Sequence, residues 1–206
     1  MATNFQWITQ GRAEMPPLNF QLIERWVREV AAGRGRILGP LTYIFCDDER
    51  ILEVNRQFLN HDYYTDIITF DDCRGKLLRG DMFISLDTVE TNAAIQGATC
   101  RQELLRVIIH GVLHLCGIND KGPGEREIME TAENQSIELL TSLCAELREE
   151  PFTAPGDTRV SEETFMERGE KEASAEVRST AKVADKEVWH TATEADRDLK
   201  DTEKHF

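Results

Sequence analysis

The chain has 206 residues, enough for one ordinary domain with a real hydrophobic core and an appendage. Its formal net charge of −14 argues against indiscriminate nucleic-acid binding, because affinity for phosphates comes mainly from clustered Lys and Arg. The five cysteines form no Cys-x-x-Cys pair and no stretch is apolar enough to cross a membrane, so we expect a cytoplasmic protein without disulfides or membrane contact.

Hydrophobic spacing predicts the elements of the first half of the chain. Apolar residues at three- and four-residue steps indicate helices, and runs of β-branched and aromatic residues indicate strands. The predicted elements are a helix over 20–33, a strand over 41–46, a helix over 47–59 capped by Asp47 or Asp48, and paired strands over 66–70 and 81–86.

The second half is predicted to be helical. A short helix begins at Asp87, and a longer one opens with Thr99 and Gln102 at capping-box spacing and runs to Gly117. This longer helix is apolar nearly all round, so we expect it to be central. A last helix follows over 125–147. Strands mixed with helices of these lengths favour an α+β fold: a single domain over 1–150, with a small mixed β-sheet packed by helices.

The composition changes at Pro151. Residues 151–206 contain 14 acids against 9 bases and few large apolar side chains, too few to offset the entropy lost on ordering. We expect an acidic polar tail that is disordered or transiently helical. The alternative is a partner-binding segment anchored by Phe165 or Trp189.

Two histidines on the central helix predict a metal site. His110 and His114 are four residues apart, so they share one helical face and direct their rings at one point. Asp120 follows the helix end and can fold back to supply an oxygen. Two imidazoles and a carboxylate suit zinc or a neighbouring first-row metal, and three protein ligands leave a position open for water. The alternative is a pair of core histidines, each satisfied separately.

An open metal position indicates hydrolysis. In the zincin peptidase motif a Glu base follows the first His directly, and here Gly111 stands there, which argues against a peptidase of that type. Gly111 costs about 1 kcal/mol of helix propensity relative to Ala, so we expect something to approach the backbone there. The general base stays open, with candidates in these positions: Asp66, Asp71, Asp72, Asn119 and the acidic stretch 125–133.

Several motifs together resemble one family. The stretch "HGVLHLCGIND" resembles the H-G-x-L-H-L-x-G-Y-D-H signature of the YbeY family of bacterial endoribonucleases. The segment "VNRQFLNHDYYTDIITF" resembles the family's L-N-x-x-Y-R-x-x-D-x-x-T-D-V-L-S-F, and "GDMFIS" and "EIMETAE" resemble its following strand and acidic stretch. The resemblance covers about residues 5–148, in order and at natural spacing.

The resemblance implies a fold and a function. It implies a single α+β domain with one zinc ion, or another first-row divalent metal. It also implies a single-strand-specific endoribonuclease that acts in ribosomal RNA processing, at the 3′ end of small-subunit 16S rRNA, and in ribosome quality control. Its partners would be single-stranded RNA and the small ribosomal subunit with its proteins, and we expect no DNA.

The family's site residues carry over with three departures. Its first two metal histidines fall on His110 and His114, but the third falls on Asp120, which leaves metal preference open. The family's preceding aspartate is Asn119 here. Its arginine falls on Leu59, which cannot clamp a phosphate. Arg56, one helical turn earlier, is the candidate catalytic residue that compensates.

Two other functions stay open. The departures at Leu59 and Asp120 favour a ribosome-associated assembly factor with weak or no nuclease activity, and a metal hydrolase with another substrate is the third possibility. Because the chain is acidic, RNA binding requires a local basic surface. Its candidate residues are Arg56, Arg74, Lys76, Arg79, Arg101 and Arg106.

Overall fold

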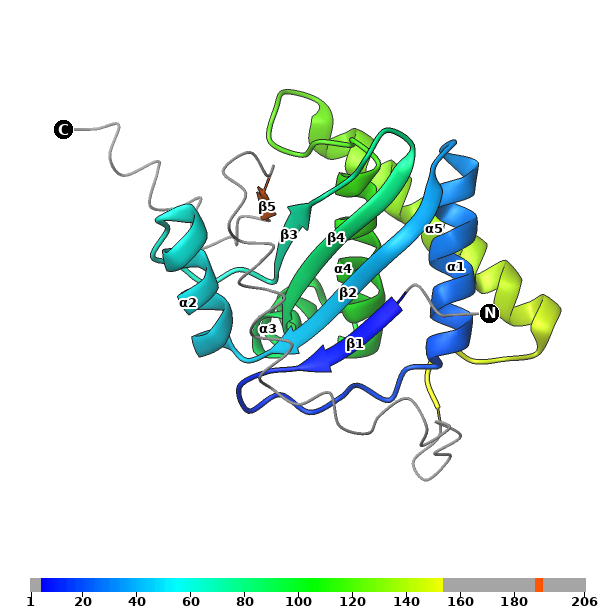
Figure 1. The fold of residues 1–206 in the computed structure, drawn as a ribbon. Helices are drawn as coiled ribbons and strands as arrows, with labels where there is room; N and C mark the ends of the chain where they lie inside the picture. The colour runs from blue at the N-terminus through cyan, green and yellow to red at the C-terminus, as the bar shows by residue number, and fades with distance from the viewer. Residues whose placement is uncertain (1–4, 154–187, 191–206) are drawn as a thin grey trace.

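The computed structural model describes residues 5–153 and 188–190, and these form a mixed sheet with helices on both faces (Figure 1). The strand order is β1-β2-β4-β3-β5, with β1, β2 and β4 parallel and β3 antiparallel to both of its neighbours. The strands are β1 (Phe5–Thr9), β2 (Ile37–Cys46), β3 (Ile67–Asp71), β4 (Leu77–Ser85) and β5 (Val188–His190). The helices are α1 (Phe20–Gly33), α2 (Asp48–Leu59), α3 (Leu86–Gln96), α4 (Cys100–Leu115) and α5 (Glu125–Leu147).

Alternation along the strands divides the core between the two faces of the sheet. On β2, Tyr43 and Phe45 belong to the large core shared with α1, α4 and α5, whereas Ile44 and Cys46 belong to a smaller core under α2. This follows from the two-residue period of a strand, which sends successive side chains to opposite faces. The sheet is thus buried on both sides, as expected for parallel strands.

Helix α4 is the central helix that the sequence predicts. Thr99 and Gln102 form its capping box, and the helix is buried from Glu103 to Leu115 apart from Arg106. A Cβ at Gly111 would lie 2.8 Å from both Ile67 Cδ1 and Met82 Sδ. The glycine therefore allows β3 and β4 to pack directly on the helix, which explains its presence between the two histidines.

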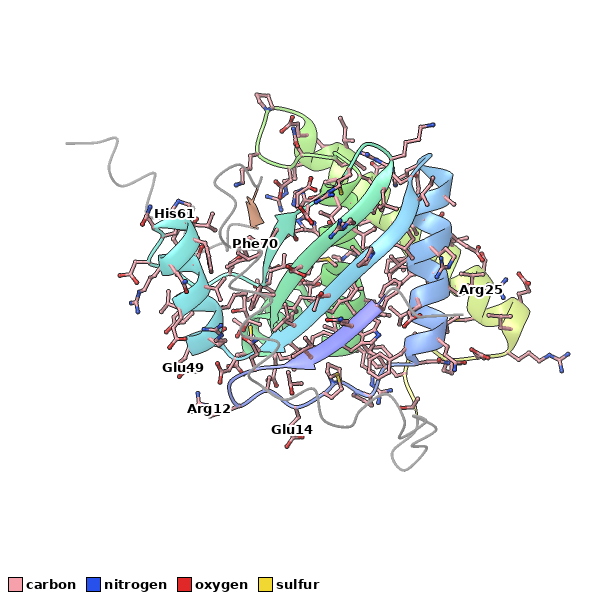
Figure 2. The ribbon with its side chains drawn as sticks, viewed as in Figure 1. Arg12, Glu14, Arg25, Glu49, His61 and Phe70 are labelled. Carbon is pink, nitrogen blue, oxygen red and sulfur yellow. The ribbon has the colours of Figure 1, made fainter. Side chains whose placement is uncertain are left out.

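The segment after β1 is tied to the start of α2. Asp47 caps α2 by accepting from the backbone N–H of Arg50 at 2.9 Å, and it also accepts from the N–H of Arg12 at 2.7 Å. The Arg12 guanidinium donates to Glu49 at 2.6 Å, and Figure 2 shows these two side chains near one another at the lower edge of the sheet. These contacts fix the start of α2 to the segment after β1, while the apolar residues of α2 pack on β3 and β4.

The predicted α+β fold is confirmed, and the predicted helices lie close to their expected bounds. Three strand features differ. Strand β1 was not predicted, β2 and β4 each begin four residues earlier than expected, and Val188–His190 pairs with β3. Apart from those three residues, the predicted tail from residue 154 onward lies outside the described residues, Phe165 included.

Within the described part of the chain, none of the helices combines the length and apolarity needed to cross a membrane.

Candidate metal centre

Three side chains converge beside the C-terminal half of α4. His110 and His114 lie one turn apart on the helix, and the chain then turns at Gly117, whose φ is +94°, to bring Asp120 back. Asp120 Oδ2 lies 3.7 Å from His110 Nε2 and 3.8 Å from His114 Nε2, and the ligand atoms of all three residues lie within 4.8 Å of one another. The structure thus brings together the three residues that the sequence predicts as metal ligands.

The outer contacts of the two imidazoles suit metal binding. His110 Nδ1 lies 2.7 Å from Glu133 Oε1, and His114 Nδ1 lies 2.8 Å from the carbonyl oxygen of Ile118. A carbonyl or carboxylate oxygen only accepts, so each Nδ1 carries the proton and each Nε2 presents a lone pair on the side of Asp120. Metal-bound histidines characteristically donate their other N–H in this way.

Two atoms of the cluster have no hydrogen-bond partner among the described residues. His110 Nε2 and Asp120 Oδ1 are buried and make no hydrogen bond to any of the residues that the structure describes. Buried polar atoms are nearly always paired, because leaving one unpaired costs about 1 to 3 kcal/mol. Both atoms belong to the predicted ligand residues, so a bound cation would satisfy them.

Glu133 belongs to an ionic chain between α4 and α5 in which the two carboxylates are buried and Arg106 is partly exposed. Its Oε2 accepts from the guanidinium of Arg106 at 3.0 Å, and Arg106 also lies 4.0 Å from Glu103. Both carboxylates are nearly inaccessible to solvent. Arg106 therefore offsets the cost of burying the carboxylate that orients His110, since a buried charge is costly unless it is paired.

The local charge of the site favours a cation. Burial lowers the pKa of His110, but the hydrogen bond and charge of Glu133, with the charges of Asp66 and Asp120, raise it by more, so it lies above its ordinary value. Burial raises the pKa of Asp120, against the opposing charges of His110 and Lys121. Three carboxylates around the imidazoles thus create a negative potential that a divalent ion would neutralise.

Glu133 is one general-base candidate whose charge acts on His110, and Asp66 is another. Asp66 is buried just before β3, its Oδ1 accepts from the N–H of Ile67 at 2.8 Å, and its charge acts on His110. Burial raises its pKa, which His110 partly opposes. The other candidates make different contacts: Asp71 accepts from the Cys73 N–H, Asp72 pairs with Arg79, and Asn119 donates to Glu125.

The structure does not bring the predicted catalytic residue Arg56 into contact with the metal cluster. Arg56 lies in the last turn of α2, more than half exposed, and pairs with Asp62 on the following loop. Leu59 is half-buried and packs against the core under α2. His61, at the end of α2 in Figure 2, has its Nδ1 3.0 Å from the hydroxyl of Tyr63.

The predicted basic residues divide into two sets. Arg74 and Lys76 are exposed in the turn before β4, and Arg79 lies nearby, paired with Asp72 at 3.2 Å. Arg106 forms an ion pair with Glu133, and the guanidinium of Arg101 lies 4.9 Å from the centre of the Phe152 ring. The surface around residues 74–79, like the exposed Arg56, is therefore a part of the predicted patch that can still meet a phosphate.

The orienting role of Glu133 was not found from the sequence. Glu133 lies in the acidic stretch that supplied general-base candidates, but it is 23 residues from His110 and meets it only because α5 packs on α4. The Ile118 carbonyl is a backbone group, so its residue type carries no information.

The fold and the site define a class: an α+β domain whose central helix presents two histidines to a carboxylate from the following turn. The family model described as "Endoribonuclease YbeY" matches residues 13–141. The chain belongs to this family, as the motifs predict.

Two relatives carry the name of the matching family model. The chain is 60% identical over 139 residues to a protein named Endoribonuclease YbeY from Bacteroides thetaiotaomicron. The matched region covers 68% of this chain and 99% of the relative. It is 59% identical over 133 residues to the protein of the same name from Phocaeicola vulgatus, covering 65% of this chain and 96% of the relative. A solution structure of TM1509 from Thermotoga maritima matches with a TM-score of 0.48 at 25% identity, covering 74% of this chain and 99% of that one.

Proposed function

We propose that this chain is a metal-dependent endoribonuclease that cuts single-stranded RNA during ribosomal RNA maturation. The relatives' printed name, Endoribonuclease YbeY, supports the reaction class. The single observation that carries the proposal is the convergence of His110, His114 and Asp120, with both imidazoles oriented by outer hydrogen bonds. We propose that residues 1–150 carry this activity and that 151–206 is an appendage.

We propose zinc as the resident ion, with another first-row divalent metal as the alternative. Two imidazole nitrogens and one carboxylate oxygen are a donor set that zinc accepts, and three protein ligands are typical of a catalytic rather than a structural site. When bound, such an ion acts as a Lewis acid that activates water and neutralises charge on the phosphate.

The protein's own residues would orient, bind and move protons. Glu133 and the Ile118 carbonyl hold the two imidazoles by Nδ1, with Nε2 on the side of Asp120. We propose Asp66 as the carboxyl that holds a proton, because its burial raises its pKa above the ordinary value and its charge acts on His110. Arg56 would contact a phosphate of the RNA in place of Asp62. Its exposed ion pair with Asp62 contributes about 1 kcal/mol or less, so little is lost when the pair breaks.

We propose that the biological substrate is the small-subunit 16S rRNA near its 3′ end, on the small ribosomal subunit in the cytoplasm, with a further role in ribosome quality control. Arg74, Lys76 and Arg79 form the local basic surface that an acidic protein needs in order to meet RNA.

Leu59 favours a second candidate function. It places an isobutyl group, packed against the core under α2, where the family motif has an arginine. Without a phosphate clamp there, the chain would be a ribosome-associated assembly factor that keeps the metal for stability and cleaves RNA weakly or not at all.

The test compares cleavage of a defined single-stranded RNA with cleavage of the same sequence as a duplex, with and without chelator, followed by zinc. The nuclease proposal expects cleavage of the single strand alone, loss of cleavage with chelator and recovery with zinc. Binding to the small subunit without cleavage would favour the assembly factor. Chelator-sensitive turnover of another phosphoester, with RNA left intact, would favour a metal hydrolase with another substrate.

A further inference from the structure

The outer edge of β3 is occupied by a segment from far along the same chain. Residues Val188–His190 form β5, which pairs antiparallel with β3 in the register Ile68↔His190, Thr69↔Trp189 and Phe70↔Val188. Figure 1 shows β5 beside β3 on the side away from β4. The family match ends at residue 141, so β5 lies outside the part of the chain that the family defines.

Strand β3 lies directly against the metal-site helix. The position of a Cβ on Gly111, between the two histidines, is 2.8 Å from Ile67 Cδ1 and 3.1 Å from Thr69 Oγ1. Asp66, immediately before β3, acts electrostatically on His110. Among the described residues, the fully buried Thr69 Oγ1 has no hydrogen-bond partner. The register thus places residue 189 opposite Thr69, and Thr69 lies against Gly111, between His110 and His114.

An edge strand accepts any extended chain that offers backbone hydrogen bonds. Here the occupant belongs to a segment that is acidic overall, because residues 151–206 contain 14 acids and 9 bases, and such a segment is not expected to attract RNA. An acidic polypeptide beside the site repels phosphates as well as taking up space. The 34 residues of 154–187 can span at most roughly 110 Å when extended, so the same molecule can supply the strand.

We propose that the outer edge of β3 is a docking edge for this chain's own C-terminal segment around Val188–His190, and that the docked segment competes with single-stranded RNA for the site formed by His110, His114 and Asp120. The competition with RNA rests on the proposed function; the docking does not. The tail then lowers nuclease activity until the ribosomal substrate displaces it.

The test uses the full chain with Val188→Pro and Trp189→Pro together. Neighbouring N–H groups of a strand point in opposite directions, so one of the two prolines removes an N–H directed at β3, and both oppose strand pairing. The control is Val183→Pro, a matched change in the tail outside β5. Hydrogen exchange of Ile68, Thr69 and Phe70 reports docking, and kcat/KM on single-stranded RNA reports competition.

We expect faster exchange at the outward-facing amides of β3 in the double variant, with exchange in α4 unchanged. If the segment is docked nine-tenths of the time, kcat/KM rises about tenfold, mainly through a lower KM, while the control matches wild type. Unchanged exchange at β3 would overturn the docking. Faster exchange with unchanged kcat/KM and RNA affinity would overturn the competition.

Two further outcomes are distinguishable. If no variant cleaves or binds RNA, the proposed function and the competition both fail, while the exchange data still decide the docking. If β3 protection depends on protein concentration and accompanies a dimer in solution, the strand comes from a second copy, and docking within one molecule is overturned.

Discussion

The Nδ1 nitrogen of His110 lies 2.7 Å from Oε1 of Glu133, across the contact between α4 and α5. This pair fixes the tautomer of the first candidate metal ligand and commits its Nε2 to the cluster with Asp120. Since Arg106 pairs with the other carboxylate oxygen of Glu133, the packing of two helices determines how one imidazole is presented.

Replacing Glu133 with Ala tests this relationship. Loss of such an outer partner typically costs 10- to 100-fold in metal affinity, so we expect a decrease of that size, measured by competition with a chromophoric chelator. The matched control is Glu130→Ala on the same helix, which removes only an exposed pair with Arg126. Equal affinities in the two variants, with both proteins folded, would remove Glu133 from the account.

Gly111→Ala tests the close packing of β3 on α4. The new methyl group would meet Ile67 and Met82 at 2.8 Å. Because overpacking outweighs the gain in helix propensity, we expect the free energy of unfolding to fall by about 1 kcal/mol. Urea denaturation measures the change. Gly33→Ala near the end of α1 is the control, because a Cβ there meets nothing within 4 Å. A Gly111 variant as stable as its control would show that the contact yields freely.

The central helix and its cluster were predictable because their determinants are local. Thr99 and Gln102 form a capping box within three residues, and His110 and His114 share a face by helical periodicity alone. Asp120 follows five residues after the helix end. The pairing of β1 (Phe5–Thr9) with β2 depends instead on a partner strand more than 30 residues away. The five residues of β1 therefore carry no local pattern that predicts this pairing.

The same distinction applies to the outer parts of the site. The glycine at position 111 predicted that another part of the chain lies close to the helix backbone. It did not predict which side chains make that contact. The contact of His110 with Glu133 depends on how α5 crosses α4, and the pairing of β3 with Val188–His190 depends on chain reversal over more than 100 residues. Such contacts are set by tertiary packing and not by spacing.

Asp47 gives the fold a pH dependence. Burial raises the pKa of its carboxyl, but the backbone hydrogen bonds from Arg12 and Arg50, with the charge of Arg12, lower it by more, so it lies below the ordinary value of 3.8. A carboxyl whose pKa is lower in the folded state stabilises the fold above pH 3.8, and this contribution disappears as the pH falls through the folded pKa.

We therefore expect Asp47→Ala to lower the free energy of unfolding at pH 7 by about 1 to 2 kcal/mol, the cost of losing a helix cap. The difference from wild type should begin to shrink below about pH 4, where the carboxyl of the unfolded chain takes up a proton first, and it should vanish once the pH has fallen through the lower pKa of the folded state. Urea titrations at several pH values measure it, with Glu53→Ala, an exposed partner of Arg50, as the control. A difference that stays constant down to the lowest pH at which the protein folds would contradict this account.

Arg56→Ala tests the proposed phosphate contact. A hydrogen bond to a charged group contributes about 1.5 to 3 kcal/mol, so we expect kcat/KM on single-stranded RNA to fall about tenfold or more while stability changes little. Arg25→Ala is the control, because Arg25 also has an exposed acidic partner but lies on α1, across the view from α2 in Figure 2. Unchanged cleavage in the Arg56 variant would remove it from the catalytic machinery.

Metal content of purified protein, determined by elemental analysis for wild type, Asp120→Ala and Asn119→Ala, tests the central claim most directly. Asn119 is the matched neighbour, since it contacts Glu125 rather than the histidines. We predict one divalent ion per wild-type chain, retention in the Asn119 variant and loss in the Asp120 variant, with RNA cleavage lost alongside the metal. A folded Asp120 variant that keeps a full ion would contradict the claim that His110, His114 and Asp120 form the metal centre.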